Sequence, residues 1–179
     1  MISDNDLMYQ AQSGDLDKLG LLYKRHNKAV FGYFYRTTFN ADLSEDLTQN
    51  VFYRVVKYRD RFRGEGKFTS WMYSIAHNVL SDHFRKNSKT EYHDDITEHE
   101  LPDPVNLDTQ IMVKEQKDIL KTAMKKLKVN QREALIMSRY HGLKYREIAD
   151  ILNCTENVVK SRIFRAINTL TDIISDIEK

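Results

Sequence analysis

Apolar residues recur at helical spacing through the first half of the chain, and four helices are expected there. The first begins at about Asp4, with Ser3 as its N-cap. The second and the fourth begin at about residues 15 and 69, and the third begins at Asp42 with Glu45 completing a capping box. The apolar positions of the last three helices are expected to form a core: Leu16, Leu19, Leu22, Tyr23, Val30, Phe34, Leu43, Leu47, Val51, Val55, Phe68, Met72, Ile75, Val79 and Phe84.

The second half has the same period, which predicts helices over residues 111–127, 131–140, 145–152 and 156–174, with Gly142 ending the second of them. Between the halves, the stretch from Asn87 to about Asp108 has few apolar residues, no helical period and both prolines, Pro102 and Pro104. We expect a flexible linker there. Since no convincing strand is found, the predicted fold class is all-α. Two small helical domains, residues 1–86 and 113–179, would be joined by a flexible linker over residues 87–112.

Residues 145–170 have the pattern of a helix-turn-helix. A short apolar helix is followed by a polar connection at 153–155, in which Thr155 can cap the next helix and Cys154 is expected to lie in the core of the turn. The second helix turns Val159, Ile163, Ala166 and Leu170 inward, so its polar and basic outer face could enter a major groove. The DNA-contact candidates are Asn157, Lys160, Ser161, Phe164, Arg165 and Asn168, flanked by Arg146 and Arg162. An ordinary helical hairpin with a solvated basic face is the alternative.

The segment Tyr58–Lys86 interleaves basic and aromatic side chains. Cations hold the phosphate backbone and aromatic faces stack on unpaired bases, so the mixture favours single-stranded or opening DNA over intact duplex. An extruded base also needs polar groups that read its edge. The candidates are Arg61, Phe62, Arg63, Lys67, Trp71, Tyr73, His77, Asn78, Asp82 and Arg85. The alternative is that the rings, Phe68 and Trp71 first among them, belong to the helix core.

A third candidate surface is the outer face of the helix that begins at Asp42. It carries Asp46, Gln49 and Asn50, near Tyr53. Taken alone, these residues are typical of a solvated helix face, and a protein-docking site is the alternative.

The formal net charge of +2 hides an uneven distribution. Residues 1–86 carry 13 Lys and Arg against 10 Asp and Glu, and residues 113–179 carry 14 against 9. Residues 87–112 carry 1 against 7, so two mildly basic segments flank an acidic one. Basic segments suit a polyanionic partner.

Several classes of protein are not supported by the sequence. The single cysteine excludes an internal disulfide framework and a cysteine-built zinc site. The chain has neither a signal peptide nor an apolar run of about 20 residues, so we expect a cytoplasmic protein that does not insert into a membrane. It also has no nucleophile–base pair, phosphate-cradling glycine loop or metal cluster, which predicts no enzymatic activity, no cofactor and no metal. His93 and His99 are interpreted as solvated linker side chains.

Six runs of residues together resemble one family. They are DLTQNVF (46–52), YRDRF (58–62), FTSWMYSIAHN (68–78), DHFR (82–85), GLKYREIA (142–149) and VKSRIFRA (159–166). In this order they resemble the small extracytoplasmic-function (ECF) group of sigma factors over roughly residues 5–86 and 113–170. Two domains in this order and at this total length make the resemblance specific. The chain departs from the family at Asn157-Val158, where Gly-Thr is usual, and at Ile167, where a basic residue is usual.

The resemblance implies a sigma factor that binds core RNA polymerase and directs promoter-specific initiation without catalysing a reaction. A sigma-2-like bundle would dock on the clamp coiled coil of the largest polymerase subunit through Asp46 and Gln49, which Asn50 and Tyr53 adjoin. The segment from Arg61 to Arg85 would capture and melt the minus-ten element. A sigma-4-like helix-turn-helix would read the minus-thirty-five element through Arg146, Asn157, Lys160, Ser161, Phe164 and Arg165, with Phe164 suited to a thymine methyl.

The implied partners are core RNA polymerase, promoter DNA and an anti-sigma factor. Two rivals remain at this point. A dimeric helix-turn-helix regulator of duplex operators would leave Tyr58–Lys86 without a role. A helical interaction module without DNA activity would show no salt-dependent DNA binding. The sequence leaves open whether the two domains pack together in the free protein.

Overall fold

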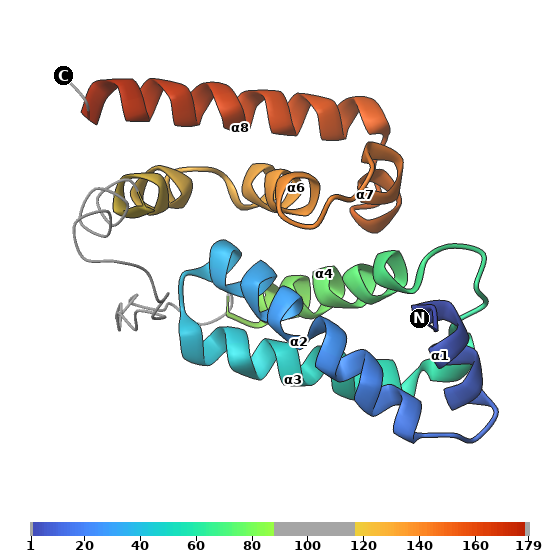
Figure 1. The fold of residues 1–179 in the computed structure, drawn as a ribbon. Helices are drawn as coiled ribbons and strands as arrows, with labels where there is room; N and C mark the ends of the chain where they lie inside the picture. The colour runs from blue at the N-terminus through green and yellow to red at the C-terminus, as the bar shows by residue number, and fades with distance from the viewer. Residues whose placement is uncertain (1, 88–116, 178–179) are drawn as a thin grey trace.

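The computed structural model describes residues 2–87 and 117–177, and the regular structure within these ranges is helical, which confirms the all-α prediction (Figure 1). The first range holds α1 (Asp4–Gln12), α2 (Asp17–Thr38), α3 (Ala41–Lys57), the 3₁₀ turn η1 (Arg59–Arg61) and α4 (Phe68–Asn87). The second holds a helix over 117–125, then α6 (Val129–Arg139), α7 (Tyr145–Ile151) and α8 (Glu156–Ile177). Apart from Asn87, which ends α4, the predicted linker lies outside the described residues, and so do His93 and His99.

Helix starts follow from local capping, and one of them corrects the sequence prediction. The Ser3 hydroxyl caps α1 as expected, accepting a hydrogen bond from the Asp6 N–H at 3.1 Å. The capping box predicted at Asp42 is wrong, because the Asn40 side chain caps α3 by accepting from the Leu43 N–H at 2.9 Å. The second helix likewise begins at Asp17, two residues later than predicted.

The core of the first half contains most of the predicted apolar positions, including Leu22, Val30 and Phe34 of α2. Three predicted core residues are instead exposed: Leu16, Tyr23 and Phe84. Leu16 precedes the first turn of α2, and Phe84 lies in the last turn of α4, beyond that helix's buried positions. Tyr23 borders an open apolar groove described below. Their exposure follows from these positions at helix ends and edges.

The helices are arranged in three layers (Figure 1). The α1–α4 bundle forms one layer, α6 and α7 lie against its α2 and α4, and α8 covers the opposite side of α6 and α7. Buried residues of both halves form one cluster, which includes Phe68 and Tyr73 from the bundle and Ile136 and Ile148 from the second half. The two predicted domains therefore pack directly on one another.

Candidate nucleic-acid interface

The helix-turn-helix forms as predicted. The four-residue connection from α7 to α8 is allowed by Asn153, whose φ of 47° is a left-handed conformation that asparagine tolerates. Thr155 then caps α8, its hydroxyl accepting from the Val158 N–H at 3.3 Å. The inner positions Val159 and Ile163 are buried. Cys154 is only half-buried against the core of the turn.

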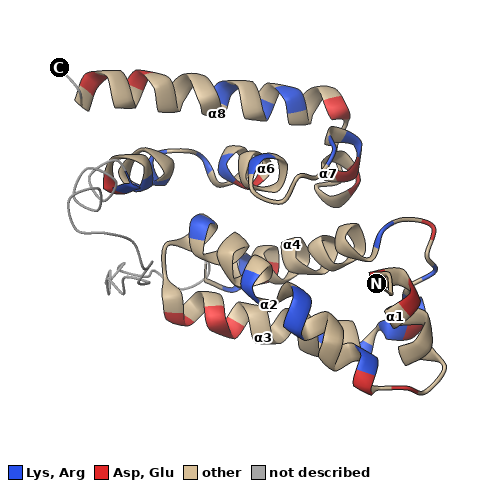
Figure 2. Ribbon diagram, in the orientation of Figure 1, with Lys and Arg blue, Asp and Glu red and all other residues tan. Residues whose placement is uncertain are grey.

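The outer face of α8 is open to solvent. The side chains of Asn157, Lys160 and Arg165 are exposed, and Phe164 is 65% exposed although it is a large apolar ring. Ser161 and Arg162 are half-buried at the edge of this face, and Arg146 is exposed on α7. Figure 2 shows that the basic residues of α8 lie in its N-terminal half, nearest the turn. The predicted contact residues of α8 thus share one accessible face, and Arg146 is exposed on the preceding helix.

A groove of about 370 Å³ extends this surface towards α6. One wall is formed by Asn157, Val158, Ser161, Arg162 and Arg165 of α8, and the other by Lys128, Asn130 and Gln131 at the start of α6. No side chain caps α6, so its first N–H groups point outward beside these cations. Such a helix start attracts an anion. Lys128, Asn130 and Gln131 were not predicted from the sequence, in which a lysine at a helix start without a capping side chain is the available signal.

The segment Tyr58–Lys86 forms a basic loop followed by α4. We call residues 58–67 the 58–67 loop. Its cations Arg61, Arg63 and Lys67 are exposed, and the Arg61 guanidinium lies 4.7 Å from the centre of the Tyr58 ring. On α4, Asn78 and Arg85 are exposed, and Asp82 binds Arg54 at 3.0 Å and Arg85 at 2.9 Å. The exposed cations of the loop suit a polyanion, whereas the Asp82 carboxylate is neutralised by Arg54 and Arg85.

Two aromatic residues of this segment do not present free faces for stacking, contrary to the sequence expectation. Phe62 is buried against Tyr9, Phe68 and Trp71, with ring centres 5.5–6.1 Å apart. Tyr73 is buried where α4 meets the second half of the chain. At both positions, removing the apolar ring from water stabilises the fold, so the ring is buried and not presented to a base. Trp71 is half-buried against the core.

A buried carboxylate joins the two halves beside the predicted DNA residues. The Glu133 side chain of α6 accepts a hydrogen bond from the Tyr33 hydroxyl, and one of its oxygens lies 2.6 Å from Nδ1 of His77. Burial and the neighbouring Glu133 charge raise the pKa of Tyr33 well above its ordinary value. His77, a predicted minus-ten residue, is therefore engaged by the second half in this arrangement.

Two more contacts cover the same face of α4. The Tyr73 hydroxyl lies 2.6 Å from Nδ1 of His141, whose pKa is lowered to about 4 by burial and by nearby Arg36. Glu147 of α7 accepts from the Ser70 hydroxyl at 2.9 Å and lies 3.7 Å from the Lys67 ammonium. Burial alone would raise the pKa of Glu147, but hydrogen bonds from the Lys144 N–H and from Ser70, together with the Lys67 charge, lower it. The Glu147 carboxylate thus binds the Ser70 hydroxyl and the Lys67 ammonium, two groups that could otherwise bind a phosphate.

The outer face of α3 is accessible, as the sequence predicted. Asp46, Gln49 and Asn50 are exposed, and Tyr53 is 63% exposed. Figure 2 shows acidic residues at the start of this helix. Beside Tyr53 lies an apolar groove of about 360 Å³ between α2 and α3, which was not predicted from the sequence. It is lined by Leu19, Gly20, Tyr23, Phe52, Tyr53, Val55 and Val56. An apolar groove next to an exposed aromatic ring suits a protein partner.

Other kinds of site find no support in the part of the chain that the structure covers. Among the described residues, no group of His, Cys, Asp and Glu side chains is arranged to hold a metal ion. None of the described helices combines the length and apolar character needed to cross a bilayer.

Both halves of the chain match known protein families. Residues 22–90 match the family Sigma-70 region 2, and residues 117–170 match the family Sigma-70, region 4. The chain is 27% identical over 172 residues to the RNA polymerase sigma-H factor of Pseudomonas aeruginosa, covering 91% of this chain and 89% of that protein. It is 28% identical over 177 residues to the ECF RNA polymerase sigma-E factor of Escherichia coli K12, covering 92% and 91%.

A solved structure has the same fold. The sigma factor RpoE of Bartonella quintana, crystallised with the anti-sigma factor NepR, superposes with a TM-score of 0.71 at 23% identity, covering 87% of this chain and 96% of that chain. The arrangement of helices found here therefore occurs in a sigma factor of known structure.

Proposed function

Because this chain belongs to the sigma-70 family, and within it to the ECF group, we propose that it binds core RNA polymerase and directs it to promoters by reading a minus-thirty-five element and melting a minus-ten element. The observation that carries the proposal is that one chain has two separate surfaces with exposed basic side chains. One is the rigid outer face of α8, which suits duplex DNA. The other is the basic 58–67 loop with α4, which suits the backbone of an opening strand.

The minus-thirty-five element is read by α8 in the major groove. Lys160 and Arg165 reach base edges or phosphates, and Phe164 contacts a thymine methyl. Arg146 and Arg162 hold the flanking phosphates, and the groove at the start of α6 adds a further phosphate contact through Lys128.

The minus-ten element is held by the exposed side chains of the first half: Arg61, Arg63, Lys67, Asn78 and Arg85. Trp71 is the aromatic ring best placed among them for stacking, since Phe62 and Tyr73 are buried. Strand opening is favoured because base contacts become available only once the strand is single, each stacked base contributing about 1–3 kcal/mol. Polymerase performs the nucleotidyl transfer, so the chain itself has no enzymatic activity.

Core polymerase docks on α3. Asp46 and Gln49 supply the polar contacts, and the apolar groove beside Tyr53 buries a side chain of the partner. In the packed arrangement, Glu133 engages His77 and Glu147 engages Lys67, two residues proposed to bind DNA. This arrangement is therefore that of the free factor. The two halves of the chain separate when polymerase and DNA bind. An anti-sigma factor, as in the relative crystallised with NepR, would hold the factor inactive in the cytoplasm.

Run-off transcription with core polymerase from the source bacterium over a genomic promoter library tests the proposal. We expect discrete transcripts that depend on the added chain and disappear when Asp46 and Gln49 are both changed to Ala. Asp172→Ala, an exposed acid on the C-terminal half of α8, is the control and should leave transcripts intact. Duplex binding without transcripts, with a competent core, would instead indicate a dimeric operator-binding regulator.

A further inference from the structure

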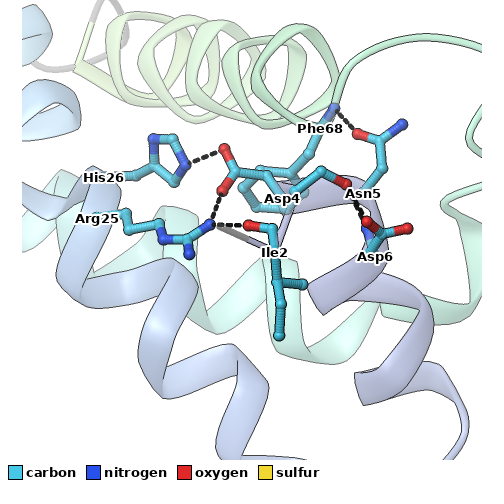
Figure 3. A network of polar contacts seen from close by, with 8 residues as sticks. Ile2, Asp4, Asn5, Asp6, Arg25, His26 and Phe68 are labelled. Atoms are coloured by element: carbon cyan, nitrogen blue, oxygen red, sulfur yellow. Dashed lines mark hydrogen bonds and ion pairs between the residues drawn. The ribbon is translucent and has the colours of Figure 1, made fainter.

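The side chain of Asn5 on α1 binds the backbone where the 58–67 loop enters α4. Its Nδ2 donates a hydrogen bond to the Gly66 carbonyl at 2.9 Å. Its Oδ1 accepts from the Phe68 N–H at 2.8 Å (Figure 3). Asn5 therefore does two things at once. It caps the first turn of α4 from a distant part of the chain, and it fixes the last residues of the loop.

Two further side chains of α1 bind the other end of the same loop. Nε2 of Gln12 donates to the Arg59 carbonyl at 2.7 Å and to the Phe62 carbonyl at 2.8 Å. The Tyr9 hydroxyl donates to the Arg63 carbonyl at 3.3 Å. The loop is thus held at both ends, and every one of these bonds ends on backbone atoms.

The loop also fits closely around α1. Gly64 has a φ of 68°, and a Cβ atom there would lie 1.6 Å from the Tyr9 hydroxyl oxygen. A residue with a side chain could adopt neither this backbone conformation at low energy nor this close approach. The observed loop path therefore depends on the surface of α1.

The first helix is itself fixed to the bundle. Its Asp4 carboxylate lies 2.7 Å from both Arg25 and His26 of α2, and Arg25 also donates to the Ile2 carbonyl at 2.9 Å (Figure 3). Leu7, Met8 and Ala11, which lie on the same face of α1 as Asp4, are fully buried in the bundle. A helix anchored in this way can impose a conformation on the loop that it binds.

We infer that α1 is a positioning element of the minus-ten surface, in which Asn5 and Gln12 hold the 58–67 loop in its DNA-binding conformation before DNA arrives. The inference rests on the proposed function and deepens it. Because the bonds use only loop backbone, they leave the exposed side chains of Arg61 and Arg63 available for DNA. An ordered loop binds more tightly since less conformational entropy is lost on binding.

Asn5→Asp and Gln12→Glu test this role in reconstituted holoenzyme. Aspartate keeps the oxygen that caps α4 but loses the N–H that binds Gly66, and glutamate at 12 loses both donated bonds. Gln10→Glu is the matched control, since it makes the same change in charge on α1 and no loop contact of Gln10 is found in the described residues. The probe is a single-stranded oligonucleotide carrying the minus-ten sequence of a promoter that the wild-type holoenzyme transcribes.

Relative to the control, we expect each variant to bind this oligonucleotide about tenfold more weakly, which corresponds to about 1.4 kcal/mol. Affinity for core polymerase and for a minus-thirty-five duplex should equal the control's. A variant that merely destabilised the fold would lower all three affinities. Equal oligonucleotide binding by both variants and the control would overturn the inference.

A second measurement needs no DNA. Amide hydrogen exchange of the free chain should be faster over residues 59–68 in the variants and in Tyr9→Phe, which removes a single exposed hydroxyl and keeps the fold. Unchanged exchange in the loop would also overturn the inference. A wild-type chain that supports no transcription would instead defeat the proposed function, and the exchange result would still decide whether α1 holds the loop.

Discussion

The carboxylate of Glu133 on α6 lies 2.6 Å from Nδ1 of His77 on α4, and this partly buried contact ties the second half of the chain to the helix proposed to bind the minus-ten element. Glu147 of α7 makes a similar contact with Ser70, about two turns before His77 on α4, and with Lys67. Acidic side chains of the second half thus face the cations and hydroxyls that DNA would use. Under the proposed function, these contacts occupy His77 and Lys67 of the minus-ten surface, whereas the outer face of α8 is accessible.

Changing Glu133 to Gln should loosen this arrangement. The amide can still accept the bond from the Tyr33 hydroxyl, but the charge facing His77 is lost. We expect the free chain to expand in small-angle scattering and to bind single-stranded minus-ten DNA several-fold more tightly. Glu45→Gln makes the same change in net charge on the exposed face of α3 and serves as the control. If the two variants bind alike, the contact does not restrain the minus-ten surface.

Arg132 should be the most sensitive charged residue of α6. Its buried guanidinium donates to the carbonyls of Met124, Lys125 and Leu127 at 2.8–2.9 Å, and to that of Thr37 in α2. Lysine has no forked group that could satisfy these acceptors together. Arg132→Lys should lower the free energy of unfolding by about 2–4 kcal/mol in urea titrations.

The matched control for this prediction is Arg139→Lys, at an exposed position of the same helix. It should change the unfolding free energy by no more than about 0.5 kcal/mol. A similar loss in both variants would mean that the carbonyl contacts of Arg132 contribute little.

Acid should weaken the fold through His141. Burial, with Arg36 nearby, lowers the pKa of this imidazole from 6.5 to about 4, so the unfolded chain takes up a proton that the folded chain excludes. Its contribution is fully present above pH 6.5 and is lost as the pH falls towards 4. Between pH 7.5 and pH 5 this amounts to a loss of about 2 kcal/mol.

Urea unfolding of the wild type and of His141→Gln at the two pH values checks this. The wild type should lose about 2 kcal/mol more than the variant on acidification. His83, whose pKa burial also lowers, is present in both chains and cancels in the difference. Equal losses would show that His141 does not titrate in this range.

The sequence was sufficient to predict the parts of the molecule that depend on local pattern. The helix-turn-helix follows from apolar spacing and a polar turn, so the buried faces at Val159 and Ile163 were predicted correctly. The third helix began elsewhere because Asn40 and Asp42 are both good caps, and the choice between them depends on tertiary fit.

The contacts between distant segments were not predictable in this way. Tyr73 lies in a basic and aromatic segment, and only its partner His141, 68 positions away, shows why it is buried. From the sequence alone, Glu133 would be placed on the exposed face of an amphipathic helix. In the structure it is buried against Tyr33 of α2 and His77 of α4. The roles of Asn5 and Gln12 also depend on backbone atoms that carry no signal in the sequence.

Two substitutions on α8 should separate base reading from phosphate binding. Phe164 is 65% exposed, so Phe164→Ala should leave the stability within about 0.5 kcal/mol of wild type. It should nevertheless weaken binding to the preferred minus-thirty-five duplex by about 1–3 kcal/mol and relax the preference at one thymine, because an apolar base contact is lost. Binding to unrelated duplex should hardly change.

Lys160→Ala should behave differently if its ammonium contacts a phosphate. Affinity would then fall for preferred and unrelated duplexes alike, and the slope of log affinity against log salt would decrease by about one. Titrations of both variants against the two duplexes at several salt concentrations provide the measurement. A sequence-selective loss for Lys160→Ala would place this side chain on a base edge, whereas a uniform loss for Phe164→Ala would show that the ring orients α8 in the groove and reads no base.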